Sequence, residues 1–261
     1  FFAVFAFAVA LVGVAYLSAS FSPRQPRTVA LDVGLSGLRI SLVLFAVTLI
    51  QDLVGREIAQ RSVVLNLSYP TSRASYLLGR YLGALALTGV AASILGLLLW
   101  IAVILSGLHY EQEFRVDLGM AYWTTVFGVW LDVAVVTAFT LCIAALSTVS
   151  MLPLTLGVTF AIAGRALGSV FDYVAKGADG QVELAARYGS LLDVIRWVLP
   201  DLSRLDWRAW PMYGLMPEPG TMALALAMAL AYATVMIGMS VQAFARREAC
   251  TRAAPASSSG R

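Results

Sequence analysis

The sequence predicts an all-α integral membrane protein, and two observations lead to this prediction. Of the 261 residues, 60% are hydrophobic and only 13% are charged, with a mean hydropathy of +0.82. Soluble domains average about 25% charged residues, so lipid is the expected solvent. In addition, about six apolar runs reach the ~20 residues that a helix needs to cross a bilayer. These expected spans are residues 1–19, 34–54, 82–106, 120–147, 150–171 and 220–245.

The apolar runs are expected to be helices rather than barrel strands. They are continuous and lack strict alternation, and a helix satisfies its backbone polar groups internally. The first run could also be read as the core of a signal peptide. However, it exceeds the usual ~7–15 residues of such a core, and no basic segment precedes it. We therefore expect a true first span.

The arginines predict the orientation of the spans. Basic residues gather after the second span and after the sixth, and the positive-inside rule places both groups in the cytoplasm. The connection 172–219 then lies outside, residues 1–248 form one transmembrane domain, and 249–261 is a disordered cytoplasmic tail. We expect a multi-pass protein of the bacterial inner membrane with a cytoplasmic C-terminus. The two groups are Arg56, Arg61, Arg73 and Arg80, and Arg246, Arg247, Arg252 and Arg261.

Several catalytic chemistries lack their motifs in this sequence. The only lysine is Lys176, so no P-loop is present and the chain cannot hydrolyse ATP by that chemistry. The single histidine, His109, and two isolated cysteines give no zinc site. No Gly-x-Ser-x-Gly elbow is found. We predict no enzyme activity, no catalytic residue, no metal and no cofactor for the chain itself. The net charge of +3 is a topology signal and predicts no nucleic-acid partner.

The segment between the second and third spans has an unusual design. Its helical pattern is broken at Pro70, and Thr71 or Ser72 can cap a new helix that runs directly into the third span. A simple connection needs only a few residues. A charged bend of this kind suits docking of a soluble partner, although its arginines would equally bind anionic lipid head groups.

The same segment closely resembles the region between spans two and three of ABC type-two permeases, the membrane subunits of ATP-binding cassette exporters. The shared pattern is Arg-Glu, then Leu-x-Leu-Ser, then Pro-Thr-Ser-Arg, then Tyr-Leu-Leu-Gly-Arg-Tyr-Leu-Gly. It differs from the family at Gln60 and at Val63-Val64, where Thr and Leu are more common. The matching residues are Arg56, Glu57, Ile58, Arg61, Ser62, Leu65, Leu67 to Arg73 and Tyr76 to Gly83.

This resemblance implies that residues 56–81 form a cytoplasmic coupling helix. It implies two copies of a P-loop ATPase subunit as partners, with ATP and Mg bound there, and a second permease subunit, making a homodimer the expectation. The coupling residues would be Arg56, Glu57, Arg61, Tyr69, Pro70, Thr71, Ser72, Arg73 and Tyr76. The chain would then serve substrate export or deliver work to a partner outside the membrane. The rival hypothesis is an ATP-independent carrier or a scaffold of an envelope complex.

The presence of polar residues inside the spans calls for a functional or structural explanation, because a charge near the bilayer centre costs at least about 2.5–3.5 kcal/mol. Asp132 lies near the middle of the fourth span and Arg165 in the fifth, so they either line a translocation path or form a structural ion pair. Arg39, in the second span, would snorkel toward the membrane surface if it has no functional role. Gln51 and Asp52 lie near the cytoplasmic end of that span.

Small residues and tryptophans give two further predictions, about helix packing and about the outside connection. In the third span, Gly79-x-x-x-Gly83 and the small run Gly89, Ala92, Ser93 and Gly96 predict helix packing within the subunit. In the fifth, Gly164-x-x-x-Gly168 suits either such packing or a dimer interface. The outside connection carries an apolar helical face and Trp197, Trp207 and Trp210. It predicts an interfacial or re-entrant helix before the sixth span, which either anchors in the interface or meets an outside protein partner.

Overall fold

The computed structural model describes residues 2–22, 24–55, 73–106, 115–147, 149, 151–175 and 200–252. Within these residues every regular element is a helix and no strand is present. The long helices are α1 Phe2–Ser20, α2 Pro26–Ile50, α5 Arg73–Ser106, α6 Met120–Leu146, α7 Leu152–Ala175 and α10 Pro219–Arg252. The short ones are η1 Gln51–Gly55, η2 Leu202–Leu205 and α9 Ala209–Tyr213.

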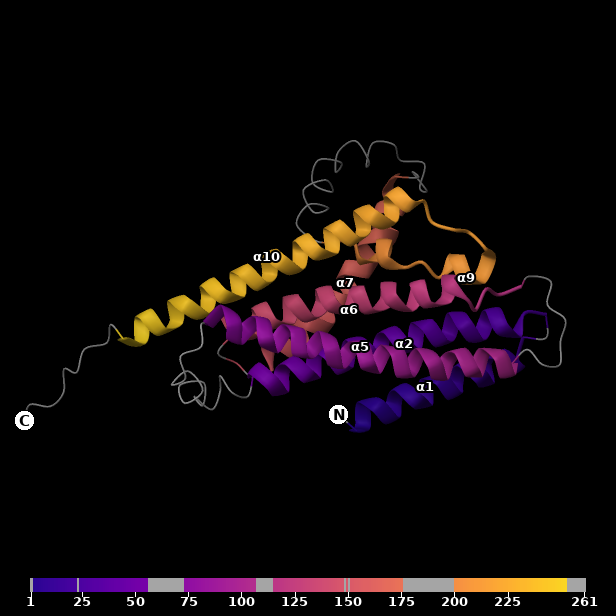
Figure 1. Cartoon of the computed structure of the whole chain (residues 1–261), viewed down its shortest axis with the longest axis horizontal. Coiled ribbons are helices and arrows are strands. Elements are labelled where there is room, and N and C mark those ends of the chain that lie inside the picture. The colour runs from indigo at the N-terminus through magenta and orange to yellow at the C-terminus, as the bar shows by residue number, and fades with distance from the viewer. Residues whose placement is uncertain are drawn as a thin grey trace, which may run out of the picture.

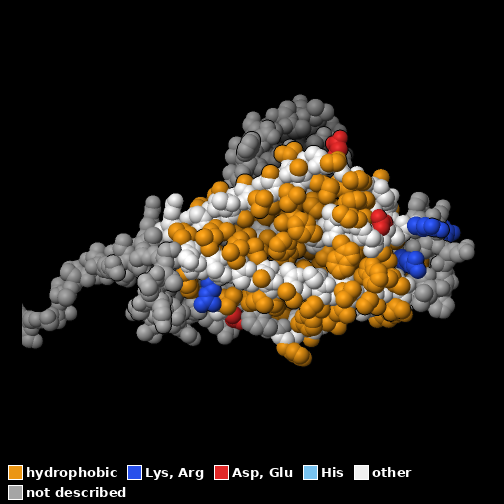
Figure 2. Space-filling view, viewed as in Figure 1, with side chains coloured by type: hydrophobic (Ala, Val, Ile, Leu, Met, Phe, Trp, Pro, Cys, Tyr) orange, Lys and Arg blue, Asp and Glu red, His pale blue; other side chains and the backbone are white. Residues whose placement is uncertain are grey.

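Five of the long helices are long and apolar enough to cross a membrane: α1, α2 with η1, α5, α6 and α10. The chain is therefore an all-helical membrane protein, as the sequence predicts. The apolar part of α7, Leu152–Gly168, has 17 residues and is shorter than the ~20 that a perpendicular span requires. Figure 2 shows the exterior that such a protein needs: hydrophobic side chains cover the middle of the visible face, and charged ones lie toward its two ends.

The bundle has two ends, which are named here by the short helices that lie at them. At the α9 end, α9 contacts both α2 and α6 (Figure 1). The η1 end holds η1, which continues α2 as a single π-helical turn, and the beginning of α5. As expected, the helix that begins at Arg73 runs without a break through the third apolar run to Ser106. Helix α2 starts at Pro26, earlier than the expected 34, because proline is favourable in the first helical turn.

Helix α6 lies at the centre of the bundle and is the most buried of the five spanning helices. It contacts α2, α5, α7 and α10. Tyr122 in α6 donates a hydrogen bond of 2.5 Å to the carbonyl of Gly96 in α5. On another side, Phe139 stacks on Phe160 of α7, which in turn stacks on Tyr232 of α10, with ring centroids 4.0 and 5.8 Å apart. These contacts fix the neighbours of α6 around it.

The glycines of α5 do not all pack as expected. Gly89 lies against Trp130, and Gly96 lies against Val126, so this part of α5 does contact α6 closely. Gly79 and Gly83, in contrast, are exposed and have no described atom within 4 Å of an added Cβ. The expectation of packing within the subunit at Gly79-x-x-x-Gly83 is therefore wrong, because α5 presents this face to the outside of the bundle.

Candidate functional site

A short segment between α7 and α10, residues 200–208, turns into the bundle at the α9 end. Asp201 caps η2, where its carboxylate accepts a hydrogen bond from the Ser203 backbone N–H at 3.2 Å. Leu202 and Leu205 are fully buried, which gives this segment an apolar base. The indole N–H of Trp207 donates to the Arg204 carbonyl at 3.0 Å. We call this the inserted loop.

Glycines on α6 and α7 make room for the inserted loop. An added Cβ on Gly128 of α6 would lie 2.7 Å from the Leu205 carbonyl oxygen, and one on Gly164 of α7 would lie 2.8 Å from Leu202 Cδ1. A Cβ on Gly168 would meet Ser203 as well as Asp201. Gly164-x-x-x-Gly168 therefore accommodates a segment of its own chain, and the dimer-interface alternative for these two glycines is not what the structure shows.

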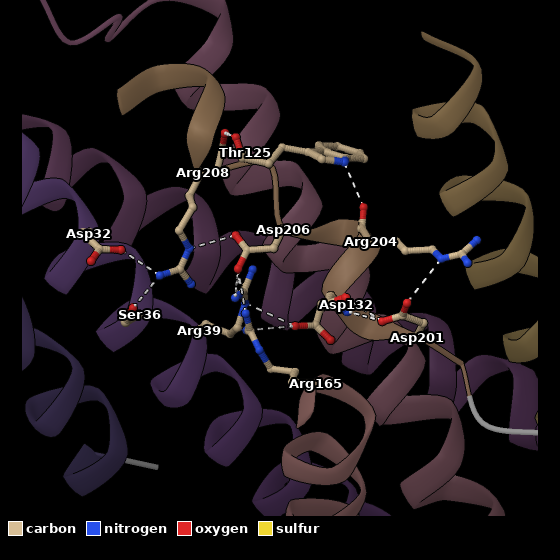
Figure 3. A network of polar contacts seen from close by, with 12 residues as sticks. Asp32, Ser36, Arg39, Thr125, Asp132, Arg165, Asp201, Arg204, Asp206 and Arg208 are labelled. Carbon is tan, nitrogen blue, oxygen red and sulfur yellow. Dashed lines mark hydrogen bonds and ion pairs between the residues drawn. The ribbon is translucent and has the colours of Figure 1, made fainter. Parts of the chain in front are cut away.

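The inserted loop carries Asp206 to the centre of a charged cluster (Figure 3). Asp206 Oδ2 accepts hydrogen bonds from Arg39 Nη1 at 3.0 Å and from Arg165 Nη2 at 2.7 Å. Its other oxygen, Oδ1, accepts from Arg208 Nε at 2.9 Å. One carboxylate thus joins arginines from α2, from α7 and from its own loop.

Asp132 of α6 is the second carboxylate of the cluster. Its Oδ2 lies 3.2 Å from Arg39 Nε and 3.7 Å from Arg165 Nη1. The ion pair that the sequence suggested between Asp132 and Arg165 is therefore present, but Arg39 is closer. Asp132 is 1% exposed, and its Oδ1 has no hydrogen-bond partner among the described residues. The cluster holds this buried charge by ion pairing rather than by complete hydrogen bonding.

Arg39 does not snorkel, and that expectation is wrong. Its side chain is buried, with 3% of the residue exposed, and it bridges Asp132 and Asp206. Arg39 lies 13 residues into α2, about 20 Å along the helix axis from Pro26. At that distance from the helix end, the guanidinium cannot easily reach the membrane surface, and pairing with two carboxylates lowers the free-energy cost of burying its charge.

Arg208 lies at the more exposed side of the cluster. Its Nη1 donates to Asp32 Oδ1 at 2.7 Å and to the Ser36 hydroxyl at 3.1 Å, and both residues belong to α2. Burial lowers the pKa of Arg208, but the carboxylates of Asp206 and Asp32 outweigh that effect and leave the pKa above its ordinary value. Three arginines and three aspartates therefore form a charge-balanced group that ties the inserted loop to α2, α6 and α7.

A cavity of about 530 Å³ lies beside the cluster, between α2 and α7. Arg39, Arg165 and Arg208 line it together with Ser36 and Asp132. The rest of its wall is apolar. This volume falls within the ~300–1,000 Å³ typical of small-molecule sites.

The remaining predicted residues are placed as follows. Gln51 lies at the η1 end, away from the cluster, and its amide donates to Met151 Sδ at 3.4 Å. Asp52 lies beside it in η1. Trp207 is 5% exposed and packs on Gly128, so its indole does not face the membrane interface as expected. Trp210, in α9, is half-buried.

Most of the expected coupling residues lie outside the described part of the chain. Only Arg73 and Tyr76 fall within it, in the first turn of α5. The guanidinium of Arg80 lies over the Tyr76 ring at 5.3 Å from its centroid. Residues outside the description are Arg56, Glu57, Arg61, Tyr69, Pro70, Thr71, Ser72 and Trp197.

Three members of the cluster were not singled out from the sequence: Asp32, Asp206 and Arg208. Asp206 and Arg208 stand in a connection rich in charges, where nothing local distinguishes a buried carboxylate from a solvated one. A usable signal is the presence of Leu202, Leu205 and Trp207 around them, because a solvated loop does not require so many large apolar side chains. Among the described residues, no group of three His, Cys, Asp or Glu side chains could hold a metal ion.

No protein-family model matches the sequence, and a comparison with curated proteins finds no match.

Proposed function

We propose that this chain is the membrane permease subunit of an ATP-binding cassette exporter, coupled to ATP hydrolysis by a separate ATPase subunit. The observation that carries the proposal is the pattern from Arg56 to Gly83, which resembles the coupling segment of ABC type-two permeases. In the proposal two such chains, each with six spans and a cytoplasmic C-terminus, assemble with two ATPase subunits in the bacterial inner membrane. In the proposal α7 is the fifth of these spans and crosses the membrane with its last turns, up to Ala175, included.

Helix α5 supplies a mechanical route from this segment into the bundle. It begins at Arg73, within the segment, and continues beyond it for a total of 34 residues. Near its start Leu77 and Tyr81 are buried, and the Tyr81 hydroxyl donates to the Ala134 carbonyl of α6 at 3.2 Å. Movement of the segment would therefore shift α5 and α6 together as packed rigid elements.

The charged cluster is the element on which such movement would act. Asp132 lies two residues before Ala134 in α6, while its partners Arg39 and Arg165 lie on α2 and α7. A shift of α6 relative to α2 and α7 would change these ion pairs and release Asp206 with the inserted loop. We propose that the inserted loop closes the path at the α9 end until ATP-driven movement releases it.

The test begins with purification of the tagged protein in mild detergent and identification of its stoichiometric partners. We expect a P-loop ATPase in equal amount. The double variant Glu57→Arg with Arg61→Glu should then abolish stimulation of that ATPase while the amount of protein in the membrane is unchanged. A matched control, Glu113→Arg with Arg115→Glu, reverses two charges in the sequence between α5 and α6 and should leave stimulation intact.

Two outcomes would contradict the proposal. Purification of the chain without an ATPase would favour the ATP-independent carrier or the envelope scaffold instead. Unchanged stimulation in the Glu57/Arg61 double variant would mean that the Arg56–Gly83 pattern does not couple the two subunits.

A further inference from the structure

We propose that the cavity between α2 and α7 is a binding site for an anionic phospholipid. In this site the phosphate contacts the guanidinium groups of Arg165 and Arg208, and an acyl chain lies along the apolar wall. The inference goes beyond the proposed function, since it needs no ATPase and applies to any membrane protein with this geometry.

The first argument is the polarity of the cavity, which is divided between its two ends. The arginines lie toward the α9 end. From there toward the η1 end, the side chains of α2 and α7 that line the cavity are all apolar. A charged end followed by an apolar slot matches an amphiphile with an anionic head. The apolar lining residues are Ile40, Val43, Leu44, Val158, Ala161 and Ile162.

The second argument is the count of hydrogen-bond donors at the charged end. A guanidinium has five N–H groups. Among the described residues Arg165 donates a hydrogen bond only through Nη2, to Asp206, while its Nη1 lies 3.7 Å from Asp132 Oδ2, an ion pair without a hydrogen bond. Arg208 donates through Nε and Nη1 but not through Nη2. The two side chains are 28% and 25% exposed, so the remaining donors are accessible rather than buried.

Accessible donors without acceptors are costly next to lipid, where no water satisfies them. A phosphate group supplies several acceptor oxygens and a negative charge, and it forms the strong charge-assisted bonds that arginine favours. Asp206 and Asp32 compensate the charge of the arginines from behind, because neither lines the cavity. Asp132 does line it, but its side chain is only 2% exposed. The surface offered to a ligand is therefore mainly cationic.

The third argument identifies the source of the ligand. Ile40 and Ile162, on opposite walls, are 54% and 66% exposed, so the cavity opens sideways between two helices of the bundle. A lipid can enter by that route. A second copy of the chain would need to bring an acceptor to this depth. Its exposed, described carboxylates are Asp32, Asp117 and Glu218. Asp32 already accepts a hydrogen bond from Arg208 of its own chain, and the other two lie in connections beyond the long helices.

The experiment uses the full chain reconstituted in vesicles that contain phosphatidylglycerol with a diazirine in one acyl chain. Photolysis followed by peptide mass analysis locates the attached lipid. We expect labelling of α2 and α7 around Ile40, Leu44 and Ile162. Diacylglycerol with the same labelled chain, which lacks the phosphate, should label these peptides about tenfold less, the size expected for losing charge-assisted hydrogen bonds.

Two variants test the two halves of the site. Ile162→Trp fills the apolar slot at an exposed position, so folding is preserved, and it should remove the labelling. Leu224→Trp, at a position of α10 that is 65% exposed, is the matched control and should leave it unchanged. Arg165→Gln should reduce labelling by phosphatidylglycerol about tenfold and leave the weak labelling by diacylglycerol as it is.

The proposal would be overturned by any of three results. Equal labelling by phosphatidylglycerol and diacylglycerol would show that the phosphate is not recognised. Labelling that survives Ile162→Trp would show lipid bound to the general surface and not in the cavity. Crosslinks from α2 and α7 to a second copy of the chain, in place of lipid, would show that a subunit interface covers the cavity.

Discussion

The same small-residue pattern occurs twice in this protein, and the two copies have opposite surroundings. Gly164 and Gly168 on α7 are covered by the inserted loop, whose Leu202 and Ser203 occupy the space that side chains would need. Gly79 and Gly83 on α5 have no described atom within 4 Å of an added Cβ. Both pairs are spaced for close approach of a partner. The comparison teaches that the pattern permits close contact but does not specify with what.

The covered pair lies beside the charged cluster, and the largest expected effect comes from breaking that cluster. Arg39→Met should reduce the free energy of unfolding by about 3–5 kcal/mol, because it leaves the buried Asp132 with only the longer contact to Arg165. Titration with a denaturing detergent measures this change. The double variant Arg39→Met with Asp132→Leu should recover much of the loss, since no buried charge remains unpaired.

The control for that experiment is Arg115→Met, at an exposed arginine in the connection before α6. It should change the free energy of unfolding by less than about 0.5 kcal/mol. A similar small change for Arg39→Met would mean that the cluster contributes nothing to holding α2, α6 and the inserted loop together.

A smaller effect is expected from filling the covered glycine pair directly. Gly168→Leu should displace the inserted loop, because its Cβ would collide with Ser203 and lie 3.0 Å from Asp201 Oδ1. Overpacking of this kind typically costs about 1–3 kcal/mol. The displacement is measured through Leu205→Cys, a fully buried position, in a background with Cys142→Ser and Cys250→Ser. The thiol should react with a maleimide only when Gly168→Leu is also present; an unreactive thiol would refute the displacement.

The smallest effect is expected at the open pair. Gly83→Leu should change the free energy of unfolding of the isolated chain by less than about 0.5 kcal/mol, since nothing described lies near the new side chain. In the same Leu205→Cys background the thiol should stay unreactive. A loss of stability comparable to that of Gly168→Leu would show that Gly83 is as closely covered as Gly168.

The sequence by itself determined the solvent of this protein and the type of its elements. Long apolar runs can satisfy their backbone groups in lipid only as helices, and this argument needs no tertiary information. It also identified Asp132 and Arg165 as charges at membrane depth that could form an ion pair, because isolated charges there are too costly, but it expected Arg39 to snorkel. These are local rules, and each can be applied to one segment at a time.

Only the tertiary structure decided which residues pair with these buried charges. Asp206 is 167 positions from Arg39 along the chain, and no periodicity or spacing connects them. The burial of Trp207 and the covering of Gly164 and Gly168 have the same origin, since both depend on where the inserted loop enters the bundle. A charge at depth requires a counter-charge, which the sequence shows, but only the packing of α2, α6 and α7 selects the carboxylate that provides it.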